Sequence, residues 1–392
     1  MSLAAHRLLE PFAKAFTGRV LAPPGRWPQT FGAFAAGLDN NLNLLRMIAA
    51  SMVLFSHSYV LTGRIDQEPL TLLSGHRTDV ARLGVVMFFG ISGFLIAQSL
   101  TRARSLYAFS VARVLRIMPG LIASTLFCAV VIGWAATSLS TSEYWRSEET
   151  WRFLVRTVGL SLDVQPGLPG VFPSNPFPVG VNGSLWTIPV EVWCYIAIAV
   201  VLGFGIGRRG YLFTVFALCV FIAYALAPDA LKALLPMDAR MTTPQLVGTF
   251  LFGSWIFINR NWIPCSIGLA AAAVVAVVLS IDTRVFAYAY FGCTVYITLV
   301  LAYHPRVRVR PYLKLGDYSY GLYVLAFPVQ QFIVWKYGAM APVALFALAF
   351  LATSPLAALS WHFIEKPSLA LKSRLRSSPR WELRLGSTEA KL

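Results

Sequence analysis

An arginine and a histidine interrupt one apolar stretch of the sequence, LRMIAASMVLFSH, as Arg46 and His57. If this stretch is helical, the spacing at ~100° per residue points both side chains the same way to within ~20°, ~16 Å apart along the axis. A histidine can act as a general base, and a guanidinium can bind an anionic group. The structural alternatives are a membrane-surface anchor for Arg46 and an interhelical hydrogen bond for His57.

A carboxylate and two further arginines could complete a site with these residues. Glu191 lies in NGSLWTIPVEVWCYI, near the start of another apolar stretch, where it either complements the helix dipole or orients the imidazole of His57. Arg113 and Arg116 are three residues apart in SVARVLRIMPG and therefore share a helical face. Paired guanidinium groups suit phosphates, although basic residues at a membrane boundary also satisfy the positive-inside rule.

Two other motifs have simpler structural explanations on their own. FFGISGFLIA places Gly90, Ser92 and Gly93 within an apolar stretch, where small residues let helices pack closely. GDYSYGLYVLAFPVQQF opens with tyrosines that could form an interfacial aromatic belt.

The five cysteines have neither metal-ligand nor redox spacing. We therefore expect buried hydrophobic cysteines and no metal site.

The composition indicates that membrane-spanning helices position these residues. Of the 392 residues, 57% are hydrophobic and 13% are charged, which is too apolar for an ordinary soluble domain. Apolar windows long enough for a bilayer recur, and we predict an all-α, polytopic membrane protein with about ten transmembrane helices. The predicted spans lie near 42–62, 83–101, 118–137, 187–206, 211–228, 245–259, 263–281, 285–303, 319–337 and 342–363.

These spans divide the chain into three parts. We expect a cytoplasmic N-terminal segment (1–40), a membrane domain (41–367) and a basic cytoplasmic tail (368–392). The N-terminal segment holds scattered basic residues and no compact apolar run with a cleavage site, so we expect no removable signal peptide.

The distribution of the net charge of +16 predicts the orientation of the chain in the membrane. With the N-terminus in the cytoplasm, the inner connections hold 22 Lys and Arg residues and the outer ones hold 9. This asymmetry follows the positive-inside rule and places both termini in the cytoplasm. Because the cationic residues are spread over the connections in this way, we expect membrane lipids and not nucleic acid as partners.

One predicted outer connection, 138–186, is unusually long. Its first half, YWRSEETWRFLVRTVGLSL, mixes aromatic and charged residues in a way that suits an interfacial helix. Its second half, QPGLPGVFPSNPFPVGVNG, is rich in proline and glycine and carries no charge, so it cannot be a helix or a central strand. It is either a rigid connector or a lid or wall over an outward-facing site.

Together these motifs make the sequence similar to the acyltransferase-3 family of bacterial integral-membrane acyltransferases, of the polysaccharide O-acetyltransferase type. The resemblance extends from about Leu38 to Pro367 and rests on six motifs in the family's order. They are the Arg46–His57 pair, FFGISGFLI, ARVLRIMPG, NGSLWTIPVEVWCY, LGDYSYGLYVLAFPV and FIEKP. Six motifs in register are a strong signal.

The resemblance implies ten spanning helices in the bacterial cytoplasmic (inner) membrane. It implies a cytoplasmic acyl-CoA donor, usually acetyl-CoA, which is a substrate and not a bound cofactor. It also implies O-acylation of a cell-surface or lipid-linked glycan. The family's functional pair falls on Arg46 and His57, and further matches fall on Ser92, Gly93, Phe94, Arg113, Arg116, Trp186 and Glu191.

On this basis we assign roles to individual residues. His57 would be a general base toward a sugar hydroxyl or a transient acyl carrier, and Glu191 would orient it or bind the acceptor. The expected catalytic residues are therefore His57 and Glu191. The expected substrate-binding residues are Arg46, Arg113, Arg116, Ser92, Gly93, Phe94, Trp186, Asn182 and Tyr320, with the three arginines at the CoA phosphates.

One departure and two rival interpretations stand beside this assignment. Many family members carry a histidine where this chain has Ala326, which favours an inactive relative as one alternative. The other alternative is a transporter that moves a glycolipid or a small solute without chemistry. Transporters often show repeated halves and paired broken helices, and the sequence shows neither.

Overall fold

The computed structural model describes residues 29–35, 40–103, 105–163, 167–178, 180–226, 243–309 and 316–376, and these are almost entirely helical. The only β-type pairings within these ranges are two isolated bridges, Thr30–Pro264 and Thr137–Val171. Most of the expected N-terminal segment and of the expected basic tail lies outside the described residues. The all-α prediction agrees with the observed helices.

Each of the ten predicted spans overlaps a helix. In chain order these helices are α3 (Leu42–Leu61), α5 (Val80–Arg102), α6 (Leu106–Leu126), α10 (Thr187–Gly203), α11 (Gly210–Leu226), α13 (Thr243–Ile258), α14 (Ile267–Ser280), α15 (Phe286–Tyr303), α16 (Ser319–Tyr337) and α17 (Pro342–Ser360). Short helices connect or flank them: α2 (Phe31–Phe34), η1 (Ile65–Gln67), α4 (Pro69–Leu73), α8 (Thr141–Arg146), α9 (Glu148–Val158), η3 (Ile206–Arg208) and η4 (Pro305–Val307).

Five of the helical segments in the described ranges are long and apolar enough to cross a membrane. They are Leu42–Leu61, Val80–Arg102, Leu106–Ala136, Phe286–Tyr303 and Pro342–Leu371. Four more apolar helices are shorter, and α16 is 19 residues long but carries Gln330, Gln331 and Lys336. The chain is therefore helical and polytopic by length and composition, although not all of the ten helices reach full spanning length.

Helix α5 lies at the centre of the bundle and packs against α3, α13 and α15. Its contact with α13 is so close that a Cβ on Gly93 would lie 2.0 Å from the carbonyl oxygen of Phe250. A Cβ on Gly253 would lie 2.2 Å from the carbonyl oxygen of Gly90. The small residues of FFGISG therefore allow backbone-to-backbone packing, as membrane helices commonly use.

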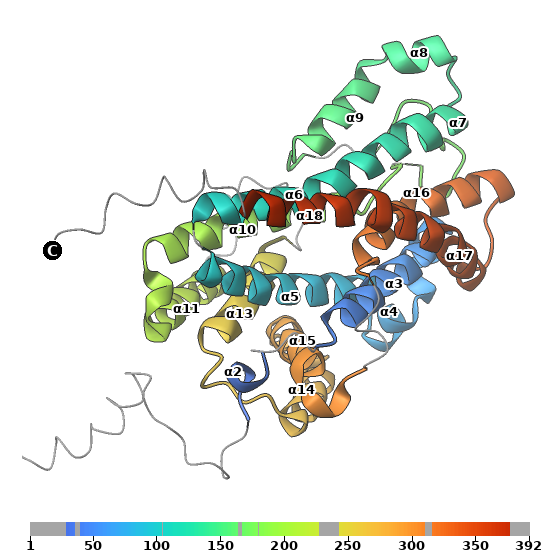
Figure 1. The fold of residues 1–392 in the computed structure, drawn as a ribbon. Coiled ribbons are helices and arrows are strands. Elements are labelled where there is room, and N and C mark those ends of the chain that lie inside the picture. The colour runs from blue at the N-terminus through green and yellow to red at the C-terminus, as the bar shows by residue number, and fades with distance from the viewer. Residues whose placement is uncertain are drawn as a thin grey trace, which may run out of the picture.

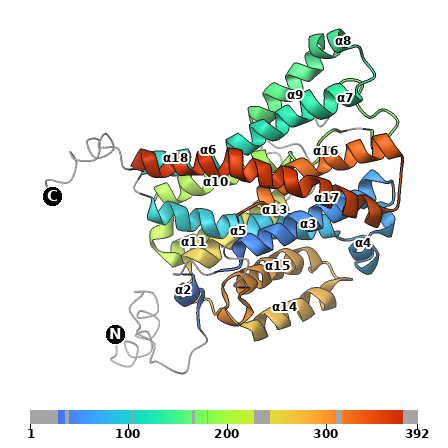
Figure 2. The same cartoon turned by 45° about the vertical axis from the view of Figure 1, so that its right-hand side comes forward.

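The other helices surround this centre in a consistent arrangement. Helix α3 packs against α16 and α17, and α18 (Lys366–Arg376) runs beside α6 (Figures 1 and 2). In both views α8 and α9 project on one side of the bundle, whereas α14 and α15 lie on the opposite side. The first half of the long connection is thus helical, as its sequence predicted.

Two helices contain π-helical segments. Helix α6 continues through η2 (Phe127–Gly133) into α7 (Trp134–Ala136), and Tyr144 donates a hydrogen bond to the carbonyl of Ala129 within η2 at 2.9 Å. Helix α17 continues through η6 (Trp361–Glu365), which ends in a buried carboxylate. Such segments are often found at functional sites.

The third predicted span begins too late. We predicted 118–137, but α6 begins at Leu106, where the side chain of Ser105 accepts a hydrogen bond from the Ala108 backbone. Arg113 and Arg116 therefore lie well within the helix and not at its end. Hydropathy missed this part because the arginines lower the local average, although both arginines are good helix formers.

The proline-rich half of the long connection is tied to α16. Asn175 donates to the backbone carbonyl of Gln331 at 3.0 Å and to its side-chain oxygen at 2.8 Å. The Gln331 amide in turn donates to the carbonyls of Phe177 and Gly180 at 2.8 and 2.7 Å. These buried bonds favour a fixed wall over a mobile lid.

Candidate active site

One carboxylate joins two of the predicted arginines. Asp317 lies two residues before α16, and its Oδ2 accepts hydrogen bonds from Arg46 on α3, at 3.2 Å, and from Arg116 on α6. The Asp317 side chain is only 8% exposed, and the two arginine side chains are about one-fifth exposed. Three helices that are distant in sequence therefore meet at one buried ion cluster.

A second carboxylate extends this cluster. Arg116 Nη1 lies 3.5 Å from Oε2 of Glu365, whose side chain is 1% exposed at the end of η6. The other oxygen of Glu365 accepts from the hydroxyl of Ser360 at 3.0 Å. The planar guanidinium of Arg116 thus contacts two carboxylates at once, which the shape of this group allows and an ammonium does not. We call Arg46, Arg116, Asp317 and Glu365 the ion cluster.

Asp317 is held in its charged form. Burial alone would raise its pKa, but Arg116, Arg46 and hydrogen bonds from Ser319 outweigh burial and lower the pKa from its ordinary value. The folded protein therefore favours the carboxylate, and its contribution to stability is lost only as the pH falls through the depressed pKa. Throughout the neutral range Asp317 remains an anionic partner for both arginines.

Tyr320 supports the ion cluster from α16. Its ring lies under Arg116, with 5.9 Å between the guanidinium carbon and the ring centroid. Its hydroxyl donates to the carbonyl of Ile117 at 2.9 Å. Space for the ring exists because residue 120 is glycine, where a Cβ would lie 2.5 Å from the ring. Tyr320 is therefore part of a packed cation–π contact and not of an aromatic belt.

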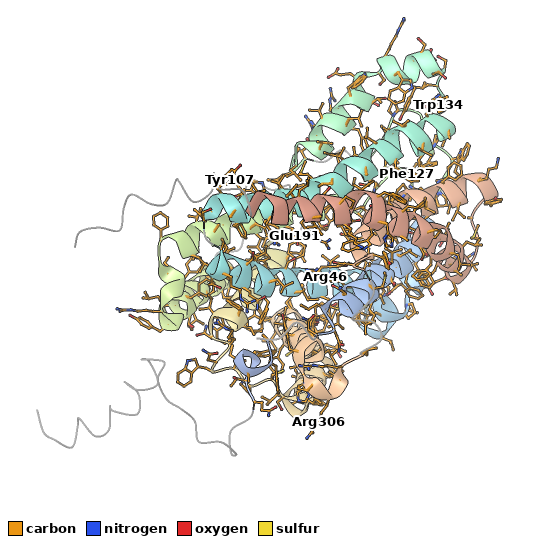
Figure 3. The ribbon with its side chains drawn as sticks, viewed as in Figure 1. Arg46, Tyr107, Phe127, Trp134, Glu191 and Arg306 are labelled. Atoms are coloured by element: carbon orange, nitrogen blue, oxygen red, sulfur yellow. The ribbon has the colours of Figure 1, made fainter. Side chains whose placement is uncertain are left out.

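Glu191 belongs to a separate hydrogen-bonded group. Its Oε1 accepts from the hydroxyl of Ser92 on α5 and from the hydroxyl of Tyr195, one turn further along α10, at 2.6 Å. We predicted that Glu191 orients His57 or binds the acceptor, and the partners observed for it are these two hydroxyls. Ser92 is thereby joined to Glu191 as one unit. Figure 3 shows Glu191 and Arg46 in the interior of the bundle.

The imidazole of His57 packs against an aromatic side chain. It lies on α3 with Arg46, and its ring meets Phe327 edge to face, with 5.0 Å between centroids. Phe177 of the proline-rich wall packs on the same Phe327 ring, at 6.1 Å between centroids. Among the residues that the structure describes, the imidazole forms no hydrogen bond or ion pair. Ala326, where the family resemblance led us to expect a histidine, is buried in an apolar cluster with Ala50.

Arg113 differs from the other two predicted arginines. Its Nε is buried and has no hydrogen-bond partner, and no carboxylate lies within ion-pair distance of it in the described part of the chain. The guanidinium carbon lies 5.7 Å from the ring centroid of Phe109. Arg113 is nevertheless within electrostatic range of Arg46, Arg116 and Glu191. Arg113 thus differs from Arg46 and Arg116, which both have Asp317 as a carboxylate partner.

The remaining residues that we predicted to bind substrate make contacts that support the fold. Asn182 donates to the carbonyl of Val324 on α16 at 2.8 Å, which fixes the end of the proline-rich wall. Trp186 is the N-cap residue of α10. Phe94 is fully buried among aromatic rings, 5.1 Å from Tyr303 and 5.3 Å from Phe257. These contacts hold the site's helices together and leave Phe94 no exposed surface.

Three residues of the site escaped the sequence analysis, namely Asp317, Glu365 and Tyr195. Asp317 and Glu365 stand in the GDYSYG and FIEKP motifs, in which we predicted a role for Tyr320 alone. The sequence did contain a signal for the two carboxylates. A carboxylate beside an apolar span needs a cationic partner, and the predicted site already held three arginines that could supply one.

No group of His, Cys, Asp and Glu residues in the described ranges could hold a metal ion.

Comparison with known proteins identifies the family. The sequence model of the acyltransferase-3 family, described as an acyltransferase domain, matches residues 39–362, and the chain therefore belongs to this family. An O-acetyl transferase of Shigella phage Sf6 is 29% identical over 362 residues, which are 88% of this chain and 99% of the relative. Nodulation protein 10 of Rhizobium leguminosarum bv. viciae is 26% identical over 363 residues, 87% of this chain and 96% of the relative. No solved structure matches the chain significantly.

Family membership confirms the resemblance and makes the chain a multi-pass membrane acyltransferase. The ion cluster, the Ser92–Glu191–Tyr195 group and His57 all lie within the matched residues, except that Glu365 lies three positions beyond their end. The site thus combines a histidine that can accept a proton, an arginine without a carboxylate partner in the described residues and a buried electrostatic framework.

Proposed function

We propose that the chain is an O-acetyltransferase that moves an acetyl group from acyl-CoA to a hydroxyl of a cell-surface or lipid-linked glycan. The observation that carries the proposal is the placement of His57 on the same helix as Arg46, which Asp317 fixes against Arg116. The full-length similarity to an O-acetyl transferase supports the acetyl group. The glycan acceptor is part of the proposal alone.

In the proposed reaction, His57 accepts the proton of a sugar hydroxyl as its oxygen attacks the thioester carbonyl of the donor. The carbon–sulfur bond then breaks, and the imidazolium returns the proton to the CoA thiolate. In the two-step variant, the imidazole first takes the acetyl group with release of CoA and then passes it to the hydroxyl. Both variants conserve atoms and leave His57 unchanged. Phe327 would limit the rotation of the imidazole by packing against its ring.

The arginines then have different roles. Arg46 and Arg116 already have the carboxylate of Asp317 as a partner, so they fix the helices and supply a positive field. Arg113 has no carboxylate partner among the described residues, so its guanidinium would be the one that contacts the donor substrate. Glu191 would keep Ser92 and Tyr195 in place at the acceptor side. The buried Ala326 means that no histidine at that position takes part.

The proposed location is the bacterial cytoplasmic membrane with both termini in the cytoplasm. The excess of basic residues in the inner connections supports this orientation. Donor would then enter from the cytoplasm and the acceptor from the opposite side. A reporter fused after Leu392 is expected to be cytoplasmic, and one inserted at Ser174 is expected to be external.

The test uses purified protein in proteoliposomes with acetyl-labelled acetyl-CoA and a crude lipid-linked glycan fraction. We expect label to enter the glycan as an alkali-labile ester and free CoA to appear in equal amount. If the protein instead moves the glycolipid across the bilayer and leaves all label on CoA, it is a transporter and the proposal fails.

A further inference from the structure

Gln330 on α16 is a buried amide that bonds to α3 beside His57. Its Nε2 donates to the backbone carbonyl of Leu54 at 2.9 Å and to the hydroxyl oxygen of Ser58 at 2.7 Å. Leu54 and Ser58 lie one helical turn apart, and His57 lies between them in the chain. The amide of Gln330 therefore contacts the turn of α3 that carries the imidazole.

These two bonds are the only hydrogen bonds that join α3 to α16 among the residues that the structure describes. The hydrophobic cluster that the two helices share includes Leu54, Leu61, Phe327 and Val334. Apolar contacts of this kind are non-directional, so they hold two helices together but let one rotate or slide against the other. Two acceptors on successive turns, bonded to one amide, fix both the rotation and the axial position of α3 at this level.

The other polar anchor of α3 is distant from the imidazole. Arg46 is held by Asp317, and it lies ~16 Å from His57 along the helix axis. A tilt of α3 by about 5° about that anchor would shift the imidazole by ~1.4 Å. A misplacement of about 1 Å at a reacting group can reduce the rate by ~10²-fold. The bonds from Gln330 therefore supply the second anchor, close to His57, that precise placement requires.

The part of α16 that carries Gln330 is held independently of α3. Pro328 has no N–H, so the carbonyl of Val324 loses its usual helical donor. Asn182 donates to this carbonyl at 2.8 Å and thus replaces the missing bond. Gln331 donates to two carbonyls of the proline-rich wall. Helix α16 can therefore serve as the frame against which Gln330 holds α3.

A polar amide is a costly way to join two apolar helices. The side chain of Gln330 is 0% exposed, and its Oε1 has no hydrogen-bond partner among the described residues. A buried acceptor without a partner destabilises the fold, and an apolar side chain of the same length would avoid this cost. Hydrogen bonds between membrane helices also contribute little to stability on average. The precision of the contact therefore explains a glutamine at this position better than stability does.

We propose that Gln330 is a positioning residue for acetyl transfer, because it fixes the turn of α3 that presents His57 to the reacting groups. Leu54 and Ser58 are fully buried against α16, whereas His57 on the same turn is partly exposed. Phe327, three residues before Gln330, contacts the imidazole itself. Helix α16 thus holds both the backbone and the ring of this turn. The inference rests on the proposed function, since Gln330 acts only through His57.

Gln330→Met tests the role, because it removes the donor and keeps the length of the side chain. It leaves α3 without an orphaned polar group, since the hydroxyl of Ser58 still donates to the carbonyl of Leu54 at 3.0 Å. We expect an unchanged or higher thermal midpoint in detergent, a kcat reduced ~10- to 100-fold, and unchanged KM values for acetyl-CoA and for the glycan. A normal kcat would overturn the proposal, whatever the thermal midpoint.

A matched pair of serine substitutions on α3 tests the same contact, and it decides the matter if Gln330→Met does not fold. Ser58 and Ser51 each donate to the carbonyl four residues earlier, at 3.0 and 2.9 Å, but only Ser58 also accepts from Gln330. We expect Ser58→Ala to lower kcat at a normal KM and Ser51→Ala to leave kcat unchanged. In the Gln330→Met background, Ser58→Ala should have no further effect. Equal kcat values of the two serine variants would contradict the positioning role.

The wild-type protein separates this inference from the proposed function. If the wild type transfers no acetyl label to a glycan, the proposed function itself fails. If the wild type transfers label and His57→Ala does not, while Gln330→Met keeps a normal kcat, only the positioning role of Gln330 fails.

Discussion

Arg46 and Asp317 meet at 3.2 Å although 271 positions separate them in the chain. The same carboxylate oxygen accepts from Arg116, so one acidic side chain joins α3, α6 and the start of α16. This contact explains how a cation can lie inside an apolar helix, since it is paired where it is buried. It also fixes the helix that carries His57.

We predict that Asp317→Asn lowers both stability and turnover. The change leaves two largely buried guanidinium groups without their common anion, and breaking such a pair costs about 3 kcal/mol or more. The thermal midpoint in detergent should fall, and kcat should fall with it because α3 loses its anchor. The control is Asp282→Asn, which removes a carboxylate that is 96% exposed. Equal behaviour of the two variants would show that the ion cluster has no structural role.

The coupling between Arg46 and Asp317 can be measured directly. In a double-mutant cycle with Arg46→Gln and Asp317→Asn, the two effects on the thermal midpoint should be strongly non-additive, because each single change already breaks the pair. Additive effects would contradict a direct interaction between these side chains.

Lysine substitutions should distinguish the structural role of Arg116 from the donor-binding role that we propose for Arg113. Arg116 contacts two carboxylates through a planar group, so Arg116→Lys should mainly reduce stability. Arg113 has no carboxylate partner in the described residues, so Arg113→Lys should mainly raise the KM for acetyl-CoA, by roughly 10-fold for a lost bond of about 1–2 kcal/mol. Wild-type kinetics of Arg113→Lys at limiting acetyl-CoA would contradict a contact between Arg113 and the donor.

Gly93→Ala should disrupt the contact between α5 and α13. The new Cβ would lie 2.0 Å from the carbonyl oxygen of Phe250, so the helices must separate, at a cost of about 1–3 kcal/mol or more. The matched control is Gly292→Ala on α15, where the new Cβ would meet nothing within 4 Å. This control should be neutral or stabilise the helix by up to ~1 kcal/mol. Comparable thermal midpoints of the two variants would contradict the packing.

Gln331→Leu should release the proline-rich wall. The substitution removes the donor to Phe177 and Gly180 and the acceptor for Asn175. We expect faster proteolysis in 167–183 and a higher KM for the glycan, with an unchanged KM for acetyl-CoA. If turnover instead rises as the segment is released, the segment acts as a lid that limits the rate.

The helices were predictable from the sequence because bilayer thickness sets the length of an apolar run. All ten predicted spans overlap helices for this reason. The start of α6 was not predictable by hydropathy, because Arg113 and Arg116 interrupt the apolar run that the window seeks. Their place within the helix becomes understandable only with Asp317 and Glu365 beside Arg116.

The residue types of the site could be predicted from the sequence, but the contacts between these residues could not. The positive-inside rule explained the arginines without any partner, so nothing in the local sequence required Asp317. Helical periodicity placed Arg46 and His57 on one face, but it could not show that Glu191 bonds to Ser92 and Tyr195. Such contacts join residues far apart in the chain, and only the packing of the helices determines them.

The central claim is that His57 carries out acetyl transfer in this membrane protein. The most direct measurement follows the transfer of acetyl label from acetyl-CoA to the lipid-linked glycan by wild type and by His57→Ala in proteoliposomes. Removing an unpaired imidazole from a helix should leave folding intact, so thermal midpoint and CoA binding serve as controls. We predict that His57→Ala binds CoA normally and transfers no label, a loss in kcat and not in donor binding. Near-normal transfer by a folded His57→Ala protein would contradict the account.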